Sequence, residues 1–139
     1  MAFTLVPKTQ FTAPVEFRIP ADNGKTEKIS FSVVFKLLSA EQVKDLNDRL
    51  AASGAAVRAE LARREADPTQ EYTPIAPAVS DRDVINEVLV GFGPDLKGED
   101  KQPLEFTSDN LDALLQIHGA AGAIVESFFK HHFKEPAKN

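Results

Sequence analysis

Apolar and polar residues alternate in two stretches near the start of the chain. The apolar positions are Val15, Phe17 and Ile19 in the first stretch, and Ile29, Phe31, Val33, Phe35 and Leu37 in the second. Such alternation predicts two strands with one apolar face, and Asn23-Gly24 between them tolerates the positive φ of a turn. We therefore expect a β-hairpin. Because a lone two-stranded sheet is marginal in water, helices or another chain must cover its apolar face.

Helical spacing of apolar residues dominates the rest of the chain. Ser39, Ser80 and Thr107 are good N-caps, and each is flanked by the apolar pair of a hydrophobic staple. The spacing predicts helices from about residue 40 to 67, from 81 to 92, from 108 to 119 and from about 120 to 133. The predicted fold class is α+β and mostly α-helical, with the N-terminal hairpin packed on about four helices.

Prolines and glycines predict the segments between these elements. Prolines at 68, 74 and 77 predict an extended linker over residues 66–79, and a turn around Gly98 predicts a small hairpin or ordered loop over 93–103. Residues 1–14 have no periodic pattern. We therefore expect an N-terminal arm over 1–14, a single α+β domain over 15–134 that contains the linker, and a C-terminal tail over 135–139.

Composition excludes several classes of function. The chain of 139 residues has a net charge of -5, and its densest basic pair, Arg63-Arg64, is followed directly by Glu65. Without clustered bases we expect no binding to nucleic acid or to anionic membranes. The absence of cysteine excludes disulfide scaffolds, thiolate catalysis and zinc fingers. No stretch approaches the roughly 18 apolar residues of a membrane span, which favours a cytoplasmic protein.

Candidate chemistry is sparse. His118 precedes a glycine at a predicted helix end, where an imidazole interacts well with the last carbonyls. His131 and His132 point about 100° apart on a helix, so they cannot easily share one ion. The acids Asp81 and Asp83 fall in the first turn of a helix, which explains them structurally. No nucleophile elbow, phosphate loop or dinucleotide motif is present, so we expect no catalytic residue, no metal, no cofactor and no enzymatic activity.

The C-terminal third carries more apolar side chains than one helix stripe needs. They are Ile124, Val125, Phe128, Phe129 and Phe133. Two interpretations stay open: all five pack internally against the hairpin, or some are exposed and bind a partner. The unpaired edges of the hairpin are a second candidate for assembly, by strand addition to another copy or to an extended partner.

Three sequence runs in this order carry a family resemblance. They are ISFSVVFKLLSAEQVKDLNDRL at 29–50, DVINEVLVGF at 83–92 and PLEFTSDNLDALLQIHGAAGAIVESFFKHHF at 103–133. With the proline-rich break between the first two, residues 15–134 resemble the tail assembly chaperones of long-tailed bacteriophages. The tryptophan that this family often has near the position of Phe92 is absent.

The resemblance implies a non-enzymatic role in the cytoplasm of a bacterial host, encoded by a phage or prophage. Such chaperones bind the tape measure protein and keep it soluble for tail tube polymerisation. A longer, frameshifted form often recruits tail tube subunits, and here the two forms would part after Lys134. Self-association remains open. The alternative function is a structural virion component, such as a tail tube, connector or terminator subunit.

Overall fold

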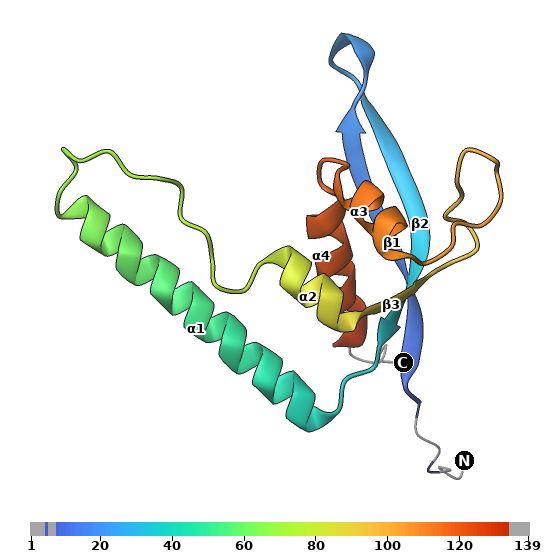
Figure 1. Ribbon diagram of the computed structural model, residues 1–139, viewed down its shortest axis with the longest axis horizontal. Coiled ribbons are helices and arrows are strands. Elements are labelled where there is room, and N and C mark those ends of the chain that lie inside the picture. The colour runs from blue at the N-terminus through green and yellow to red at the C-terminus, as the bar shows by residue number, and fades with distance from the viewer. Residues whose placement is uncertain (1–4, 6–7, 134–139) are drawn as a thin grey trace, which may run out of the picture. The chain divides into compact units, whose positions relative to one another are not determined.

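The computed structural model describes residue 5 and residues 8–133. Its elements are β1 (Gln10–Pro20), a 3₁₀ turn (Asp22–Gly24), β2 (Thr26–Lys36), α1 (Ala40–Glu65), α2 (Asp81–Val88), β3 (Leu89–Phe92), α3 (Ser108–Leu115) and α4 (Ala120–His132), as Figure 1 shows. The fold class is α+β, as predicted. Among the described residues, no helix is long and apolar enough to cross a membrane.

The chain forms two compact units. The sheet unit comprises Met1–Leu37 and Ile85–Asn139, and the helical unit comprises Leu38–Val84. The expected division into a single domain with an arm and a tail stays a prediction. Residues 1–4 and 6–7 of that arm and the whole tail at 135–139 lie outside the described residues.

The predicted hairpin is confirmed, and its first strand begins earlier than expected. β1 pairs with β2 over its whole length, with Val15 opposite Phe31 and Phe11 opposite Phe35. The strand starts at Gln10 rather than Val15, so Pro14 lies inside it. A proline is tolerated there because β1 is at the edge of the sheet and needs no N–H at that position.

A third strand corrects the predicted helix over 81–92. The helix ends at Val88, and β3 pairs antiparallel with β2, so the sheet order is β1-β2-β3. Phe35 lies opposite Leu89 and Val33 opposite Phe92. Five of the apolar residues from 84 to 92 fit helical spacing, but Gly91 disfavours helix and β-branched Val90 favours a strand once β2 offers an edge.

The three predicted N-caps are all present. The hydroxyl of Ser39 accepts from the N–H of Gln42 at 3.2 Å, and the Gln42 side chain accepts in turn from the Ser39 N–H at 2.9 Å. The hydroxyls of Ser80 and Thr107 likewise accept from the backbone N–H three residues on, at the starts of α2 and α3. α3 ends at Leu115, before the predicted stop at Gly119. That glycine has φ +88° and is instead the N-cap of α4.

The small hairpin expected over 93–103 is confirmed and is tied to the sheet. Lys97 and Pro103 form a bridge, and the N–H of Leu104 donates to the carbonyl of Leu96 at 2.8 Å. Asp95 accepts from the backbone N–H of Ser32 at 2.8 Å, and this bond lowers the pKa of the Asp95 carboxyl.

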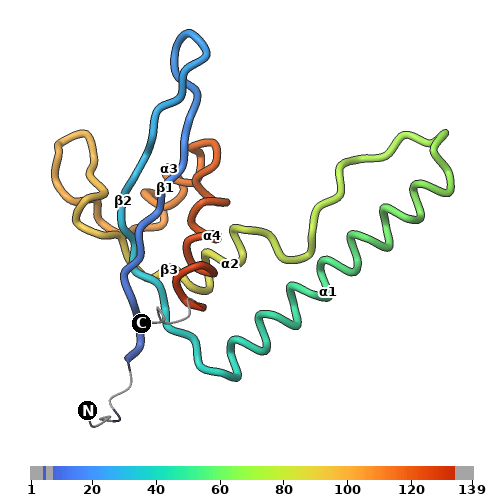
Figure 2. The backbone as a smooth tube through the Cα atoms, turned by 180° about the vertical axis from the view of Figure 1, so that it is seen from behind, coloured from blue at the N-terminus to red at the C-terminus, as the bar shows by residue number. Residues whose placement is uncertain are grey.

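The core of the sheet unit lies between the sheet and its helices. Its fully or largely buried apolar side chains are Ala13, Val15, Phe31, Val33, Phe35, Ile85, Val88, Leu89, Leu111, Leu114, Ala120, Ile124 and Phe128. α4 runs along β1, and Figure 2 shows the tip of the hairpin extending beyond α3 and α4. The apolar face of the hairpin is therefore covered near its base and less covered toward its tip.

Candidate partner-binding surface

The apolar residues of α4 form two stripes about 100° apart. Ile124 and Phe128, four residues apart, are fully buried. Val125 and Phe129 are half-buried, and Phe133, just past the helix end, is 42% exposed. The five residues predicted from the sequence thus divide between the core and the second stripe.

Phe128 is the centre of the aromatic packing in the sheet unit. Its ring lies 5.3 Å from that of Phe35, centroid to centroid, in an edge-to-face arrangement. The rings of Phe11 and Phe129 lie 6.3 and 5.3 Å away. Edge-to-face pairs of this kind add to the free energy of burial. In this structure Ile124 and Phe128 therefore support the fold.

The second stripe presents aromatic surface. Phe129 and Phe133 stack with centroids 6.0 Å apart and ring planes 13° apart. Together with Val125 they lie at i, i+4 and i+8, which is one face of a helix. We call these three residues the α4 stripe, and its role in partner binding remains a prediction.

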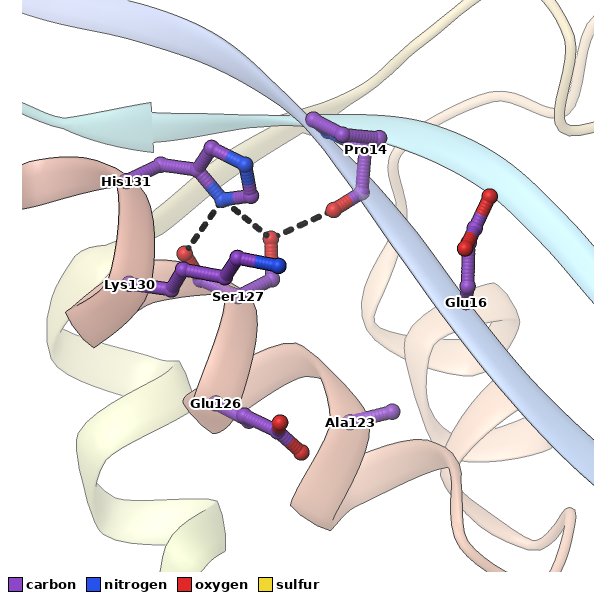
Figure 3. A pocket seen from close by; sticks show the side chains of 7 residues that line it. All are labelled: Pro14, Glu16, Ala123, Glu126, Ser127, Lys130 and His131. Carbon is purple, nitrogen blue, oxygen red and sulfur yellow. Dashed lines mark hydrogen bonds between the residues drawn. The ribbon is translucent and has the colours of Figure 1, made fainter. Parts of the chain in front are cut away.

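A pocket of about 290 Å³ lies between α4 and β1 (Figure 3). It is lined by Pro14, Glu16, Ala123, Glu126, Ser127, Lys130 and His131. The hydroxyl of Ser127 donates to the carbonyl of Pro14 at 2.6 Å, and Nδ1 of His131 lies 2.9 Å from the carbonyl of Ser127. Ser127 thus fastens α4 to β1 through a backbone carbonyl, whereas His131 bonds to Ser127 within α4.

The histidines do not form a metal centre in the part of the chain that the structure describes, where no cluster of three ligand side chains occurs. His118 is exposed in the turn after α3. The His132 ring packs 5.0 Å from that of Phe128, and burial lowers the pKa of His132 below its ordinary value of 6.5.

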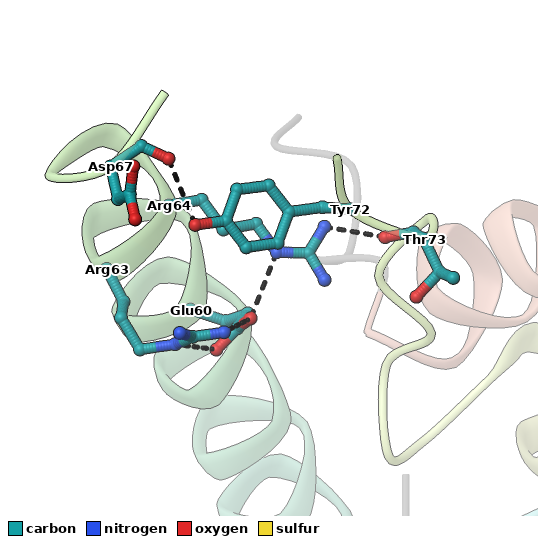
Figure 4. A network of polar contacts seen from close by, with 6 residues as sticks. All are labelled: Glu60, Arg63, Arg64, Asp67, Tyr72 and Thr73. Carbon is teal, nitrogen blue, oxygen red and sulfur yellow. Dashed lines mark hydrogen bonds and ion pairs between the residues drawn. The ribbon is translucent and has the colours of Figure 1, made fainter. Parts of the chain in front are cut away.

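A polar network at the end of α1 was not predicted from the sequence (Figure 4). Glu60 accepts from Arg63 at 2.6 and 2.9 Å and from Arg64 at 2.9 Å. These bonds, first those from Arg63, lower the pKa of Glu60 to about 2. The Tyr72 ring lies 4.7 Å from the Arg64 guanidinium, and its hydroxyl donates to the carbonyl of Asp67 at 3.0 Å.

The same network holds the segment 66–79 against α1. Arg64 donates to the carbonyl of Thr73 at 2.6 Å, and the N–H of Val79 donates to the buried hydroxyl of Ser53 at 3.2 Å. Since Val79 reaches back to Ser53 near the middle of the helix, the segment runs along α1 toward its start. We call this arrangement the α1 clamp. The sequence contains one signal for the ion pairs of this clamp, because Arg63 and Arg64 stand at i+3 and i+4 from Glu60.

Comparison with known proteins identifies the family. A family model described as phage tail assembly chaperone matches residues 1–139. Comparisons with curated proteins and with solved structures give no match. The match spans the whole chain and agrees with the resemblance carried by residues 15–134. The chain therefore belongs to the phage tail assembly chaperone family.

Proposed function

We propose that this chain is a non-enzymatic chaperone that binds the tape measure protein and keeps it soluble for tail tube polymerisation. The observation that carries the proposal is the family match over residues 1–139. The setting is the cytoplasm of the bacterial host. A longer form made by frameshifting is proposed to recruit tail tube protein, and its point of divergence after Lys134 lies outside the described residues.

We assign the α4 stripe as the contact surface. A tape measure protein is long and helical, so its segments present amphipathic faces that need cover before the tube forms. Helices of this kind bind to apolar surface through residues at i, i+3, i+4 and i+7. The stacked rings of Phe129 and Phe133, with Val125 one turn before them, offer rigid apolar surface for that purpose.

The first experiment is co-expression of this chain with the long, helix-rich protein encoded beside it. We expect that partner to become soluble and to co-elute with the chaperone on size exclusion. If the partner stays insoluble while this chain is found in purified phage particles, the protein is a virion component and the proposal fails.

The surface assignment has its own test. The double variant Phe129→Ser/Phe133→Ser should lose co-elution while its circular dichroism spectrum and unfolding midpoint show that the sheet unit is folded. Phe106→Ser is the matched control, because Phe106 is 39% exposed against 42% for Phe133 and lies outside α4. Unchanged co-elution of the double variant would leave the chaperone role intact and remove the α4 stripe from it.

A further inference from the structure

The outer edge of β1 carries backbone groups that face away from the sheet. The N–H of Leu37 donates to the carbonyl of Thr9, and that of Ala21 to the carbonyl of Lys25, so the odd-numbered residues of β1 bond to β2. The even-numbered residues Glu16 and Arg18 therefore direct their N–H and C=O groups outward. β1 is the first strand of the sheet order, so this edge has no neighbouring strand among the described residues.

Two prolines bracket this stretch of edge. Pro14 and Pro20 are also even-numbered, and neither has an N–H to offer outward. The carbonyl of Pro14 already accepts from Ser127 on α4. Strand addition to β1 is thus confined between Pro14 and Pro20, where Glu16 and Arg18 supply the outward donors and acceptors.

The side chains on the outer face are charged in an unbalanced way. Arg18 lies directly opposite Lys28 in the β1–β2 register, and like charges at opposed positions destabilise a sheet. The Nζ of Lys28 lies 3.4 Å from Oε1 of Glu16, which is its diagonal neighbour on β1. Arg18 donates to the hydroxyl of Thr26 on the β2 side at 3.1 Å, and a carboxylate on its other side, at the outer edge, would complete the pattern.

We propose that two copies of this chain pair through β1, antiparallel, about a twofold axis at Phe17. In that register Glu16 lies opposite Arg18 of the second copy, and each N–H of the pair donates to the other's carbonyl. Pro14 lies opposite Pro20 of the second copy, so both ends of the added ladder fall where neither strand has a donor.

The same register also gives the side chains at the edge favourable partners. Each Arg18 gains a Glu16 carboxylate on its free side, and each Phe17 lies opposite the Phe17 of the second copy in the close, non-hydrogen-bonded type of pair. Phe17 is half-buried on the apolar face, where its ring lies 6.3 Å from that of Phe31 and next to Gly119 at the start of α4. Its pairing across the axis would cover more of that ring.

A second copy fits this edge better than an unrelated strand because the edge is complementary to itself. One axis matches charge with opposite charge, ring with ring and proline with proline. This pairing does not depend on tape measure binding. Dimerisation of the chain alone and co-elution with the tape measure protein are therefore independent measurements.

Cysteine cross-linking tests the register directly, since the chain has no cysteine of its own. Phe17→Cys places two thiols opposite each other across the axis, so mild oxidation should give a disulfide-linked dimer. Ile19→Cys is the matched control on the same face of the same strand. In this register residue 19 lies opposite Val15 of the second copy, so the two thiols of the control variant are separated by about 14 Å, too far to bond.

Sedimentation velocity over a concentration series tests the charges. We expect the natural chain to reach twice its 15.2 kDa mass. Glu16→Lys or Arg18→Glu should weaken dimerisation by about tenfold or more, because each change acts twice across the axis. The swap Glu16→Arg/Arg18→Glu should restore it, and Glu27→Lys on β2 should leave it unchanged.

Several results would overturn the proposal. A chain that stays monomeric at every concentration, with folded Phe17→Cys that does not cross-link, excludes the pairing. Equal cross-linking at positions 17 and 19, or a dimer that ignores both charge reversals, places the interface elsewhere. If the chain alone is monomeric and the charge reversals instead abolish co-elution with the tape measure protein, the edge binds an extended segment of that partner.

Discussion

In the sheet unit the chain is held by buried rings, whereas in the helical unit the segment after α1 is held by polar groups near the surface. Phe128 is fully buried against Phe35 and Phe11. The α1 clamp instead relies on Glu60, its two arginines and Tyr72, with the Arg63 side chain 63% exposed. Water and salt weaken exposed ion pairs but act little on buried apolar contacts.

The difference indicates two levels of stability in one chain. Regions with few buried apolar contacts and solvent-accessible hydrogen bonds open at lower free energy than the core does. We therefore expect the segment 66–79 to release from α1 under conditions that leave the sheet unit folded. The sheet unit then provides the fixed platform for the α4 stripe, and the helical unit provides an element that can rearrange.

The largest effect is expected from Phe128→Ala. Truncating a fully buried phenylalanine costs about 3–5 kcal/mol, through lost burial and the cavity that remains. The free energy of unfolding from urea titration, followed by far-ultraviolet circular dichroism, measures it. Phe106→Ala is the control, since that ring packs on Phe92 but is 39% exposed, and its cost should be clearly smaller. Equal costs would mean that Phe128 is not the centre of the core.

The next effect compares two serines, one in each unit, that are both 6% exposed. Ser127→Ala leaves the Pro14 carbonyl without its donor and should cost about 1–3 kcal/mol of global stability. Ser53→Ala removes only the 3.2 Å bond from Val79 and should loosen the segment locally. Hydrogen exchange measures both, because it separates global from local opening. If Ser53→Ala lowers global stability as much as Ser127→Ala does, the two units do not differ in the way we infer.

Acid should separate the two units by pH. Burial lowers the pKa of His132, so as the pH falls below about 6.5 the unfolded chain binds a proton that the folded chain does not, and the sheet unit loses stability. The pKa of Glu60 falls from 4.5 to about 2 on folding, so the clamp keeps its contribution above pH 4.5 and loses it between 4.5 and about 2. The sheet unit should therefore weaken first.

The chain provides a specific probe for this comparison. Tyr72 is its single tyrosine and it has no tryptophan, so tyrosine fluorescence reports on the α1 clamp alone. Between pH 7 and 5 the urea midpoint from circular dichroism should fall while the tyrosine signal in the absence of urea is unchanged. His132→Leu should flatten that fall. A tyrosine signal that changes over the same range would assign the titration to the helical unit.

Local signals in the sequence predicted most of the fold. Ser39, Ser80 and Thr107 started their helices as expected because a cap acts on the next three residues and needs no distant partner. The start of β1 and the strand β3 were missed for the opposite reason. Gln10–Pro14 becomes a strand only because β2 lies beside it, and Leu89–Phe92 extends only because β2 has a second free edge.

The candidate surface was predicted in part. The excess of apolar residues on α4 was visible, but periodicity alone gives no preference between the stripe of Ile124 and Phe128 and the stripe of Val125 and Phe129. The position of β1 decides it, because Ser127 bonds to Pro14 and turns its own side of α4 toward the strand. The α1 clamp was missed because Tyr72 is brought to Arg64 by the course of a segment that has no regular structure.

The smallest effect on global stability is expected from Glu60→Gln, which sharpens the comparison most. The variant removes the charge that both arginines share but keeps the shape of the side chain. The urea midpoint from circular dichroism should stay the same, while acrylamide should quench Tyr72 more strongly and proteases should cut within 66–79 sooner.

Glu65→Gln, an exposed acid on the same helix turn outside the network, is the control and should change neither signal. High salt should produce a smaller change of the same kind in the natural chain, because it screens the exposed Arg63–Glu60 pair more than the partly buried Arg64–Glu60 pair. If Glu60→Gln instead unfolds the sheet unit, the clamp is part of one cooperative core and the segment cannot release by itself.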